Sequence, residues 1–148
     1  MAEIRKISDI DELMLWRSEV IRHVFGEDAD DDLLSENRCY YVRHITDGTH
    51  IAIIASSDGR DCGCGGCCFS DELPSPDNPT GKCAYLMNIY VREEFRNKGL
   101  AHQIVSWLVE ESQNRGCGKI YLESTADGKP VYTSLGFHDM ADMMKYSD

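Results

Sequence analysis

Residues 91–101 read Val-Arg-Glu-Glu-Phe-Arg-Asn-Lys-Gly-Leu-Ala, and they join two segments of different character. The apolar run over residues 85–91 predicts a strand. Apolar residues at helical spacing over residues 100–108 predict a helix. We therefore expect the chain to pass here from the end of a strand, through a turn containing Gly99, into the start of a helix.

A turn of this kind has the chemistry of a phosphate-binding site. The first N–H groups of a helix have no partner within the helix, and the helix dipole makes that end positive, so anions bind there. Arg96 and Lys98 place two cations at the same point. Gly99 has no Cβ, so a ligand can approach the backbone closely.

Residues 96–101 resemble the acetyl-CoA-binding motif of the GNAT N-acetyltransferase superfamily, in which Arg or Gln-x-x-Gly-x-Gly or Ala follows a strand. In that family the backbone amides of the motif hold the CoA pyrophosphate. The resemblance implies acetyl-CoA as the co-substrate and no metal. It implies these binding residues: Ile89, Tyr90, Val91, Arg96, Asn97, Lys98, Gly99, Leu100, Ala101 and His102.

A second motif lies at residues 128–137, which read Gly-Lys-Pro-Val-Tyr-Thr-Ser-Leu-Gly-Phe. It resembles the later signature of the same family, a short helix that carries a Tyr and ends in Leu-Gly-Phe. Pro130 near the start and Gly136 just past the end suit the entry and exit of a helix. The two motifs are separated by the length of one helix and one strand.

Together the motifs make the resemblance specific over residues 82–137, and element order extends it to the first half of the chain. It implies an α/β fold: one GNAT-type domain over residues 1–148, with a mixed central sheet flanked by about four helices and splayed around the acetyl-CoA site. The length and the 42% hydrophobic content suit one domain with one core.

Apolar periodicity and turn residues predict the individual elements. Strands are expected over residues 3–7, 49–56, 65–70, 82–91 and 119–124. Helices are expected over residues 9–25, 31–44, 98–115 and around Tyr132. In the first helix the apolar spacing has one polar break, at Arg17. Three of the four prolines predict a loop over residues 73–81, and residues 137–146 are expected to form a last strand or hairpin.

Acetyl transfer to an amine needs a base for the amine proton and an acid for the leaving thiolate. The resemblance places Tyr132 beside the CoA sulfur, where a phenol of pKa about 10 is protonated at neutral pH and can donate. The base stays open between Glu123 and Asp127, which stands where many relatives have Asn. Asn88 interrupts the apolar strand before the first motif and indicates a bulge, a lined cleft or a hydrogen-bonded core residue.

The resemblance implies that the acetyl group moves from acetyl-CoA to a primary amine by direct attack in a ternary complex. The acceptor is expected to be a small-molecule or peptide amine. Acidic residues cluster at residues 27–32, and two interpretations apply: a solvated surface, or a field that steers a cationic acceptor. The sequence leaves open whether the protein forms a homodimer.

Charge and hydropathy exclude several other classes. Fifteen basic and twenty-six acidic residues give a net charge of −11, which disfavours binding to nucleic acid and to anionic membranes. No apolar run approaches the roughly 20 residues of a membrane span, and the N-terminus lacks the apolar core of a signal peptide. A cytoplasmic location is the resulting expectation.

Seven cysteines, four of them within residues 62–68, raise the alternative of a metal or redox sensor. Cys64 and Cys67 supply one zinc-type pair, but the second pair is missing. Strand alternation offers packed thiols instead, with Cys62 and Cys64 on one face and Cys67 on the other. An acyl-CoA sensor or a non-catalytic GNAT module is the other alternative, and Tyr132 argues against it.

Overall fold

The computed structural model describes residues 2–148. Its strands are β1 (Glu3–Ile7), β2 (His50–Ser57), β3 (Arg60–Asp71), β4 (Lys82–Val91) and β5 (Lys119–Leu122). Its helices are α1 (Ile10–Phe25), α2 (Asp31–Thr46), α3 (Leu100–Asn114) and α4 (Lys129–Ser134), with a single 3₁₀ turn at Glu93–Phe95. The predicted order of elements is confirmed up to α4.

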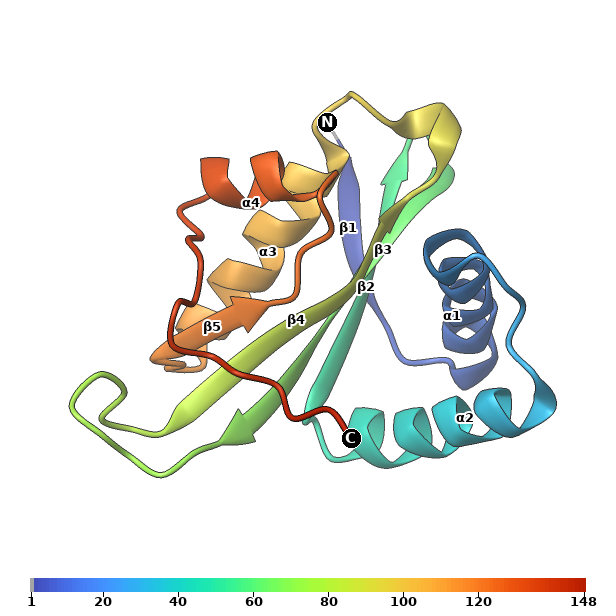
Figure 1. The fold of residues 1–148 in the computed structure, drawn as a ribbon. Coiled ribbons are helices and arrows are strands. Elements are labelled where there is room, and N and C mark those ends of the chain that lie inside the picture. Colours follow the sequence, from blue (N-terminus) through green and yellow to red (C-terminus); the bar gives the residue numbers. More distant parts are fainter. Residues whose placement is uncertain (1) are drawn as a thin grey trace.

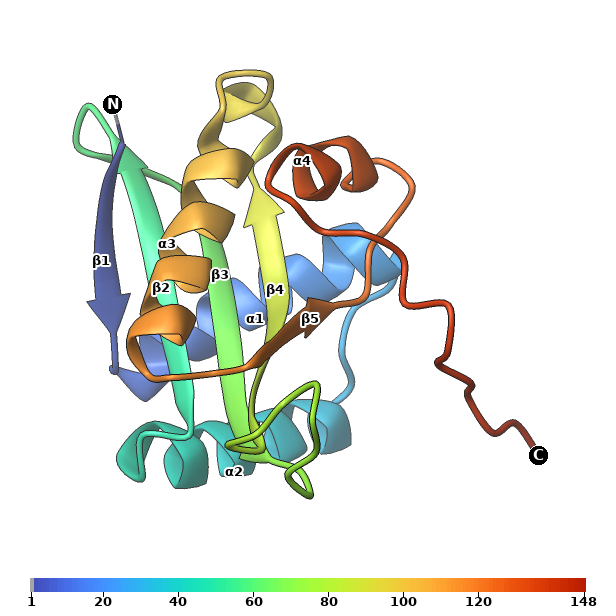
Figure 2. The same ribbon diagram turned by 90° about the vertical axis from the view of Figure 1, so that its left-hand side faces the viewer.

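The strands form one sheet in the order β1-β2-β3-β4-β5. The first three pairs are antiparallel, and β4 pairs with β5 in parallel. A parallel pair needs a long crossover, which α3 supplies. Figure 1 shows α1 and α2 on one face of the sheet and α3 and α4 on the other, and Figure 2 shows α3 in front of β2 and β3, running roughly along these strands. The mixed sheet expected from the sequence is confirmed.

The sheet opens where β4 continues beyond β5. The two strands pair only between residues 83–86 of β4 and residues 119–122 of β5. From Met87 to Val91, β4 has no strand beside it on that edge in the described chain. After β5 the chain turns away towards α4 instead (Figure 1). The result is a splay between β4 and the segment that leads to α4.

A β-bulge lies in β4 at this opening. Gly66 pairs with Met87 and Cys64 pairs with Tyr90, so that Asn88 and Ile89 stand opposite the single residue Gly65. Asn88 has a φ of 57°, in the left-handed region that non-glycine residues seldom adopt. A bulge leaves backbone groups unpaired in the ladder. Of the three readings of Asn88, the bulge is confirmed.

Two apolar layers cover the faces of the sheet. Alternate residues of β2 contribute side chains to the two layers: Ile53 packs towards α3, and Ile54 packs towards α1 and α2. This two-sided burial explains why β2 is a continuous apolar run. Gly65 lets α3 pack closely on β3, because an added Cβ would lie only 2.6 Å from Cγ2 of Ile104.

The cysteines lie on both faces of β3. Cys64 packs in the layer beneath α1 and α2, and Cys67 packs towards α3, as alternation predicts. The prediction for Cys62 is wrong: it packs on the α3 side with Cys67. The cause is a second bulge, because Ala55 pairs with Gly63 and Ser56 with Asp61, which leaves Cys62 as the extra residue.

Two other expectations need correction. The strand expected over residues 65–70 begins five residues earlier, at Arg60, because alternating glycines hide its start. The strand or hairpin expected over residues 137–146 is absent from the described structure, where this segment is irregular. Its apolar residues do not alternate, and Met144 and Tyr146 are 96% and 88% exposed, so no buried face holds a strand.

No helix within residues 2–148 combines the length and the apolar character needed to cross a bilayer.

Candidate active site

The turn between β4 and α3 presents unpartnered backbone amides. Gly99 is the N-cap of α3, with a φ of 79°, and no side chain caps this helix. The first helical bond runs from the amide of Gln103 to the carbonyl of Gly99. The amides of residues 100–102 therefore precede the helical ladder and are available to a ligand. A Cβ on Gly99 would meet nothing within 4 Å, so the approach to the turn is open.

Two cations flank these amides, as the sequence predicts. Arg96 and Lys98 are both exposed. The Nε of Arg96 donates to the carbonyl of Val91 at 2.9 Å, which ties the guanidinium to the end of β4 and leaves its terminal nitrogens for a ligand. His102 is exposed on the first turn of α3. The free amides and the two cations together favour an anion at this turn.

Tyr132 lies on α4, on the same side of the sheet as α3. Its ring is half-buried and packs against Gly128, where an added Cβ would lie 2.9 Å from Cε2 of Tyr132. The centres of the Tyr132 and Phe137 rings are 6.1 Å apart. Burial raises the pKa of the Tyr132 phenol. Its hydroxyl has no hydrogen-bond partner within residues 2–148. The phenol is thus protonated at neutral pH and free to donate.

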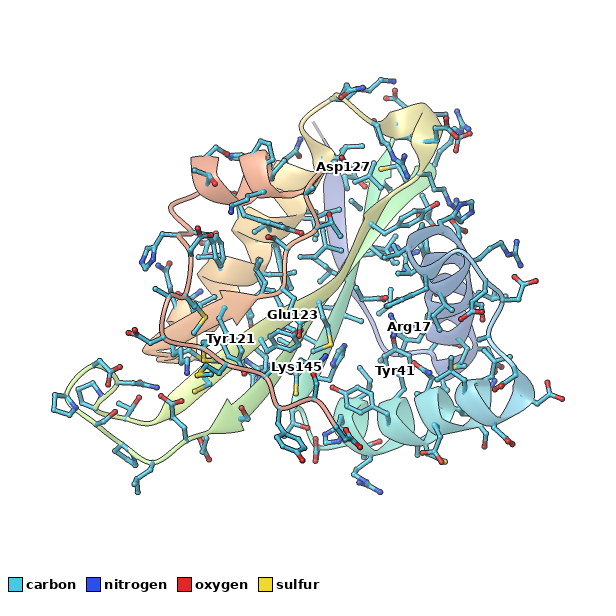
Figure 3. The ribbon with its side chains drawn as sticks, viewed as in Figure 1. Arg17, Tyr41, Tyr121, Glu123, Asp127 and Lys145 are labelled. Carbon is cyan, nitrogen blue, oxygen red and sulfur yellow. The ribbon has the colours of Figure 1, made fainter. Side chains whose placement is uncertain are left out.

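Glu123 and Asp127, the two candidate bases, lie apart. Asp127 lies beside the start of α4, whereas Glu123 lies near Tyr121 at the end of β5 (Figure 3). The rings of Tyr121 and Tyr85 are 4.9 Å apart. Burial, with a smaller contribution from the Glu123 carboxylate, raises the pKa of Tyr85 to about 12. Both carboxylates are exposed.

Arg17 was not among the candidate residues predicted from the sequence, although it contacts the β4 bulge. Arg17 lies on α1, and its Nη1 donates to Oδ1 of Asn88 in the β4 bulge at 2.8 Å. Its Nε donates to Oδ1 of Asn37 on α2 at 3.0 Å. Figure 3 shows Arg17 and Tyr41 together between the helices and the sheet. The polar break in the apolar spacing of α1 was the available signal.

The acidic segment between α1 and α2 is partly explained by local structure. The Asp28 carboxylate pairs with Nε of Arg22 at 2.8 Å. Asp30 is the N-cap of α2 and accepts the amide of Leu33 at 2.8 Å. Asp31 and Asp32 lie in the first turn of α2, where the helix dipole favours negative charge.

The cysteine cluster does not add a further site within the described chain. No group of three or more His, Cys, Asp or Glu side chains within residues 2–148 is placed to hold a metal ion. Burial raises the pKa of Cys64 and Cys67 to about 12 each. Both thiols are therefore protonated at neutral pH and unreactive.

The open β4–β5 edge, the bulge and the amide turn are the features of an α/β protein with a splayed mixed sheet. The family model described as "Acetyltransferase (GNAT) family" matches residues 10–137. The chain therefore belongs to the GNAT acetyltransferase family.

Individual relatives agree with this assignment. A thialysine N-epsilon-acetyltransferase of Sus scrofa is 25% identical over 97 residues, which cover 51% of this chain and 57% of the relative. A glucosamine 6-phosphate N-acetyltransferase of Arabidopsis thaliana is 29% identical over 69 residues, 46% of each chain. The chain thus spans about half the length of the curated relatives it matches.

A solved structure extends the likeness to nearly the whole chain. It is a predicted acetyltransferase of Clostridium acetobutylicum with acetyl-CoA, with a TM-score of 0.88 and 26% identity. The match covers 99% of this chain and 96% of that one. The fold expected from the two sequence motifs is therefore confirmed over both halves of the chain.

Proposed function

We propose that this protein is an acetyl-CoA-dependent N-acetyltransferase that acts by direct attack of a primary amine in a ternary complex. The observation that carries the proposal is the continuity of three features along one edge of β4. The bulge at Asn88 and Ile89 lies in the strand, Val91 ends it, and the amides of α3 follow after the turn at Gly99. A long ligand with a thioester at one end and a pyrophosphate at the other suits this path.

Acetyl-CoA binding follows from these features. The pyrophosphate accepts hydrogen bonds from the amides of residues 100–102, beside Arg96 and Lys98. The pantetheine arm lies along residues 89–91, in the splay between β4 and the segment before α4. A backbone amide freed by the bulge donates to the acetyl carbonyl. Such a donor stabilises the oxyanion that forms when the carbonyl is attacked.

The proton transfers can be assigned to residues of the site. A free alkyl ammonium has a pKa of about 10.4, so the acceptor must lose a proton before it attacks. Glu123 or Asp127 takes that proton, directly or through water. The amine nitrogen then forms a bond with the acetyl carbon and loses its second proton to water, and the carbon–sulfur bond breaks with its electron pair on sulfur. Tyr132 gives its proton to this thiolate and recovers one from solvent.

Between the two bases, we favour Glu123. It directly follows β5, near Tyr121, and faces the side of the sheet where α1 and α2 lie (Figure 3). The relatives named above are acetyltransferases of thialysine and of glucosamine 6-phosphate, both small amines. A small-molecule or peptide amine is accordingly the acceptor class we propose here.

An acceptor panel tests the proposal. Free coenzyme thiol and acetylated product are followed with amino acids, polyamines, aminoglycosides and short peptides in the presence of acetyl-CoA. We expect thiol and acetylated amine to appear one to one with at least one acceptor. Tight acetyl-CoA binding without transfer to any amine would favour the acyl-CoA sensor instead.

A further inference from the structure

Arg17 differs from every other arginine in residues 2–148. Arg17 and Arg92 are the two that are partly buried, and the remaining arginines are exposed. Arg92 has a carboxylate partner, because its Nε and Nη2 donate to the two oxygens of Glu19 at 2.9 Å each. Arg17 has no carboxylate partner within the described residues, and its partners are the neutral amide oxygens of Asn37 and Asn88.

A half-buried guanidinium without a counter-ion is unfavourable in a free protein. Moving the charge out of water has a cost that a neutral amide oxygen offsets only in part. The cost is offset when an anion occupies the site. In a chain with 26 acidic residues, a half-buried arginine without a carboxylate partner therefore indicates that the anion comes from a ligand.

The hydrogen bonds of Arg17 within the protein leave some of its N–H donors free for such a ligand. A guanidinium has five N–H donors. Nε and one N–H of Nη1 are used by Asn37 and Asn88. Nη2 and the second N–H of Nη1 remain, and these two nitrogens form an edge that matches the two oxygens of a carboxylate.

Tyr41 adds a neutral donor beside this edge. Its side chain is 4% exposed and lies next to Arg17 in Figure 3. No hydrogen bond to its hydroxyl is present within residues 2–148. Burial raises the pKa of Tyr41 to about 12, against a smaller opposite effect of Arg17. The phenol therefore keeps its proton and can donate to an anion.

The location of Arg17 connects this anion to the acceptor. Asn88, which Arg17 contacts, is a residue of the β4 bulge, and Ile89 is its neighbour in the chain. The bulge is the point where the acetyl group is proposed to bind. A ligand anion at Arg17 thus lies beside the reacting centre, on the side of the sheet that Glu123 and Tyr121 also face (Figure 3).

We propose that Arg17 and Tyr41 form a carboxylate-binding subsite, and that the acceptor is an amine that also carries a carboxylate, such as a free amino acid. This inference rests on the proposed N-acetyltransferase function and names its substrate class. One guanidinium matches a monoanion better than a phosphate dianion. The neighbouring Arg22 and Arg38 pair with Asp28 and Asp11, so they add no free cation.

The experiment compares acceptors that differ only in the carboxylate. Initial rates with saturating acetyl-CoA are measured for each amino acid against its amide, with cadaverine against L-lysine as a further pair. We expect kcat/KM to favour the acid by roughly 10- to 100-fold in the wild-type protein. Arg17→Gln should reduce that ratio to about one through a higher KM for the acid, with little change for the amide.

Arg22→Gln is the matched control, because Arg22 lies on the same helix with an exposed side chain. It should leave the acid-to-amide ratio unchanged. Loss of packing in the Arg17 variant would lower acid and amide rates together, so an unchanged ratio in Arg17→Gln contradicts the subsite. A preference for amides, for cadaverine or for glucosamine 6-phosphate over every amino acid also contradicts it.

Equilibrium binding separates this inference from the proposed function. Calorimetry with CoA-loaded protein measures the same acids and amides without any transfer. Binding of an acid that exceeds its amide in the wild type, and is lost in Arg17→Gln, supports the subsite even if no amine is acetylated. Equal binding of each acid and its amide overturns the subsite even if acetylation is observed.

Discussion

At the scale of single residues, the surroundings of Tyr132 keep its phenol protonated. Burial raises the pKa of its phenol, and its hydroxyl has no protein partner within the described residues. We expect Tyr132→Phe to keep the ring packing against Phe137 and to lower kcat by roughly 10²–10⁴, the usual range for lost general acid catalysis. Acetyl-CoA affinity, measured by calorimetry, should change little. Wild-type turnover in this variant would remove Tyr132 from the mechanism.

The raised pKa of Tyr132 also gives a direction for the pH profile. The donor is lost only when the phenol ionises, and the ordinary phenol pKa is about 10. Because burial moves this pKa upwards, the alkaline decline of kcat that depends on Tyr132 should lie above pH 10. Stopped-flow rates, which limit exposure to alkali, measure it. An alkaline decline at pH 8 that is absent from Tyr132→Phe would contradict the assignment.

His50 makes stability depend on pH. Its side chain is 4% exposed, and its Nδ1 lies 2.8 Å from the Tyr40 hydroxyl. Burial lowers the pKa of His50 to about 4. As the pH falls, His50 is therefore protonated near pH 6.5 in the unfolded chain but only near pH 4 in the folded chain. The free energy of unfolding should fall by about 3 kcal/mol between these two values as the pH is lowered.

Chemical denaturation at a series of pH values measures this slope. His50→Gln keeps a polar side chain and cannot titrate, so its slope between pH 6.5 and 4 should be shallower. The matched control is the same substitution at an exposed histidine, His138→Gln. An identical slope in the wild type and in His50→Gln would show that His50 is not the group responsible.

Residue-scale features were the least predictable from sequence. Tyr132 and Gly99 belong to contiguous motifs, so their elements could be assigned directly. Arg17 acts with Asn37 and Asn88, which come from two other elements, and nothing in the local sequence shows that they meet. The only sequence signals were polar residues in apolar settings, at Arg17 and at Asn88.

At the scale of elements, the turn between β4 and α3 is the proposed phosphate site. Gly99 has a φ of 79°, and Asn tolerates this conformation better than other residues with a side chain. We expect Gly99→Asn to preserve the helix start and to put a side chain where the pyrophosphate binds. Acetyl-CoA affinity should fall by roughly tenfold, the equivalent of about 1.4 kcal/mol.

Calorimetry of acetyl-CoA binding measures the effect, with thermal unfolding as a check on folding. Gly26→Asn is the matched control: Gly26 has a φ of 78°, caps α1 and is equally open. The two variants should lose similar stability, and only Gly99→Asn should lose affinity. Unchanged affinity in Gly99→Asn would show that the phosphate site lies elsewhere.

Elements were predictable where local chemistry and the fold agree. The strand over residues 82–91 and the proline-rich loop before it were placed as observed, because an apolar run and prolines both act locally. The start of β3 was missed because glycines carry no strand signal. The bulge that moves Cys62 to the other face depends on pairing with β2, which no single segment reveals.

At the scale of the whole molecule, the net charge is negative, but the side chains along the proposed substrate path include several basic ones. The chain has a net charge of −11, while Arg96 and Lys98 flank the start of α3 and Arg17 contacts the β4 bulge, along the proposed path of the substrates. Part of the acidic segment at residues 27–32 caps α2 or pairs with Arg22. Steering of a cationic acceptor by this segment stays a prediction, as does a homodimer.

The whole-molecule claim is that both substrates are bound together before the acetyl group moves. Initial rates of thiol release, measured while acetyl-CoA and an accepted amine are varied, test it, together with the mass of the protein after exposure to acetyl-CoA alone. We predict intersecting double-reciprocal lines, no thiol without an amine and an unchanged protein mass. Parallel lines with an acetylated protein, or acetyl-CoA binding with no transfer to any amine, would contradict it.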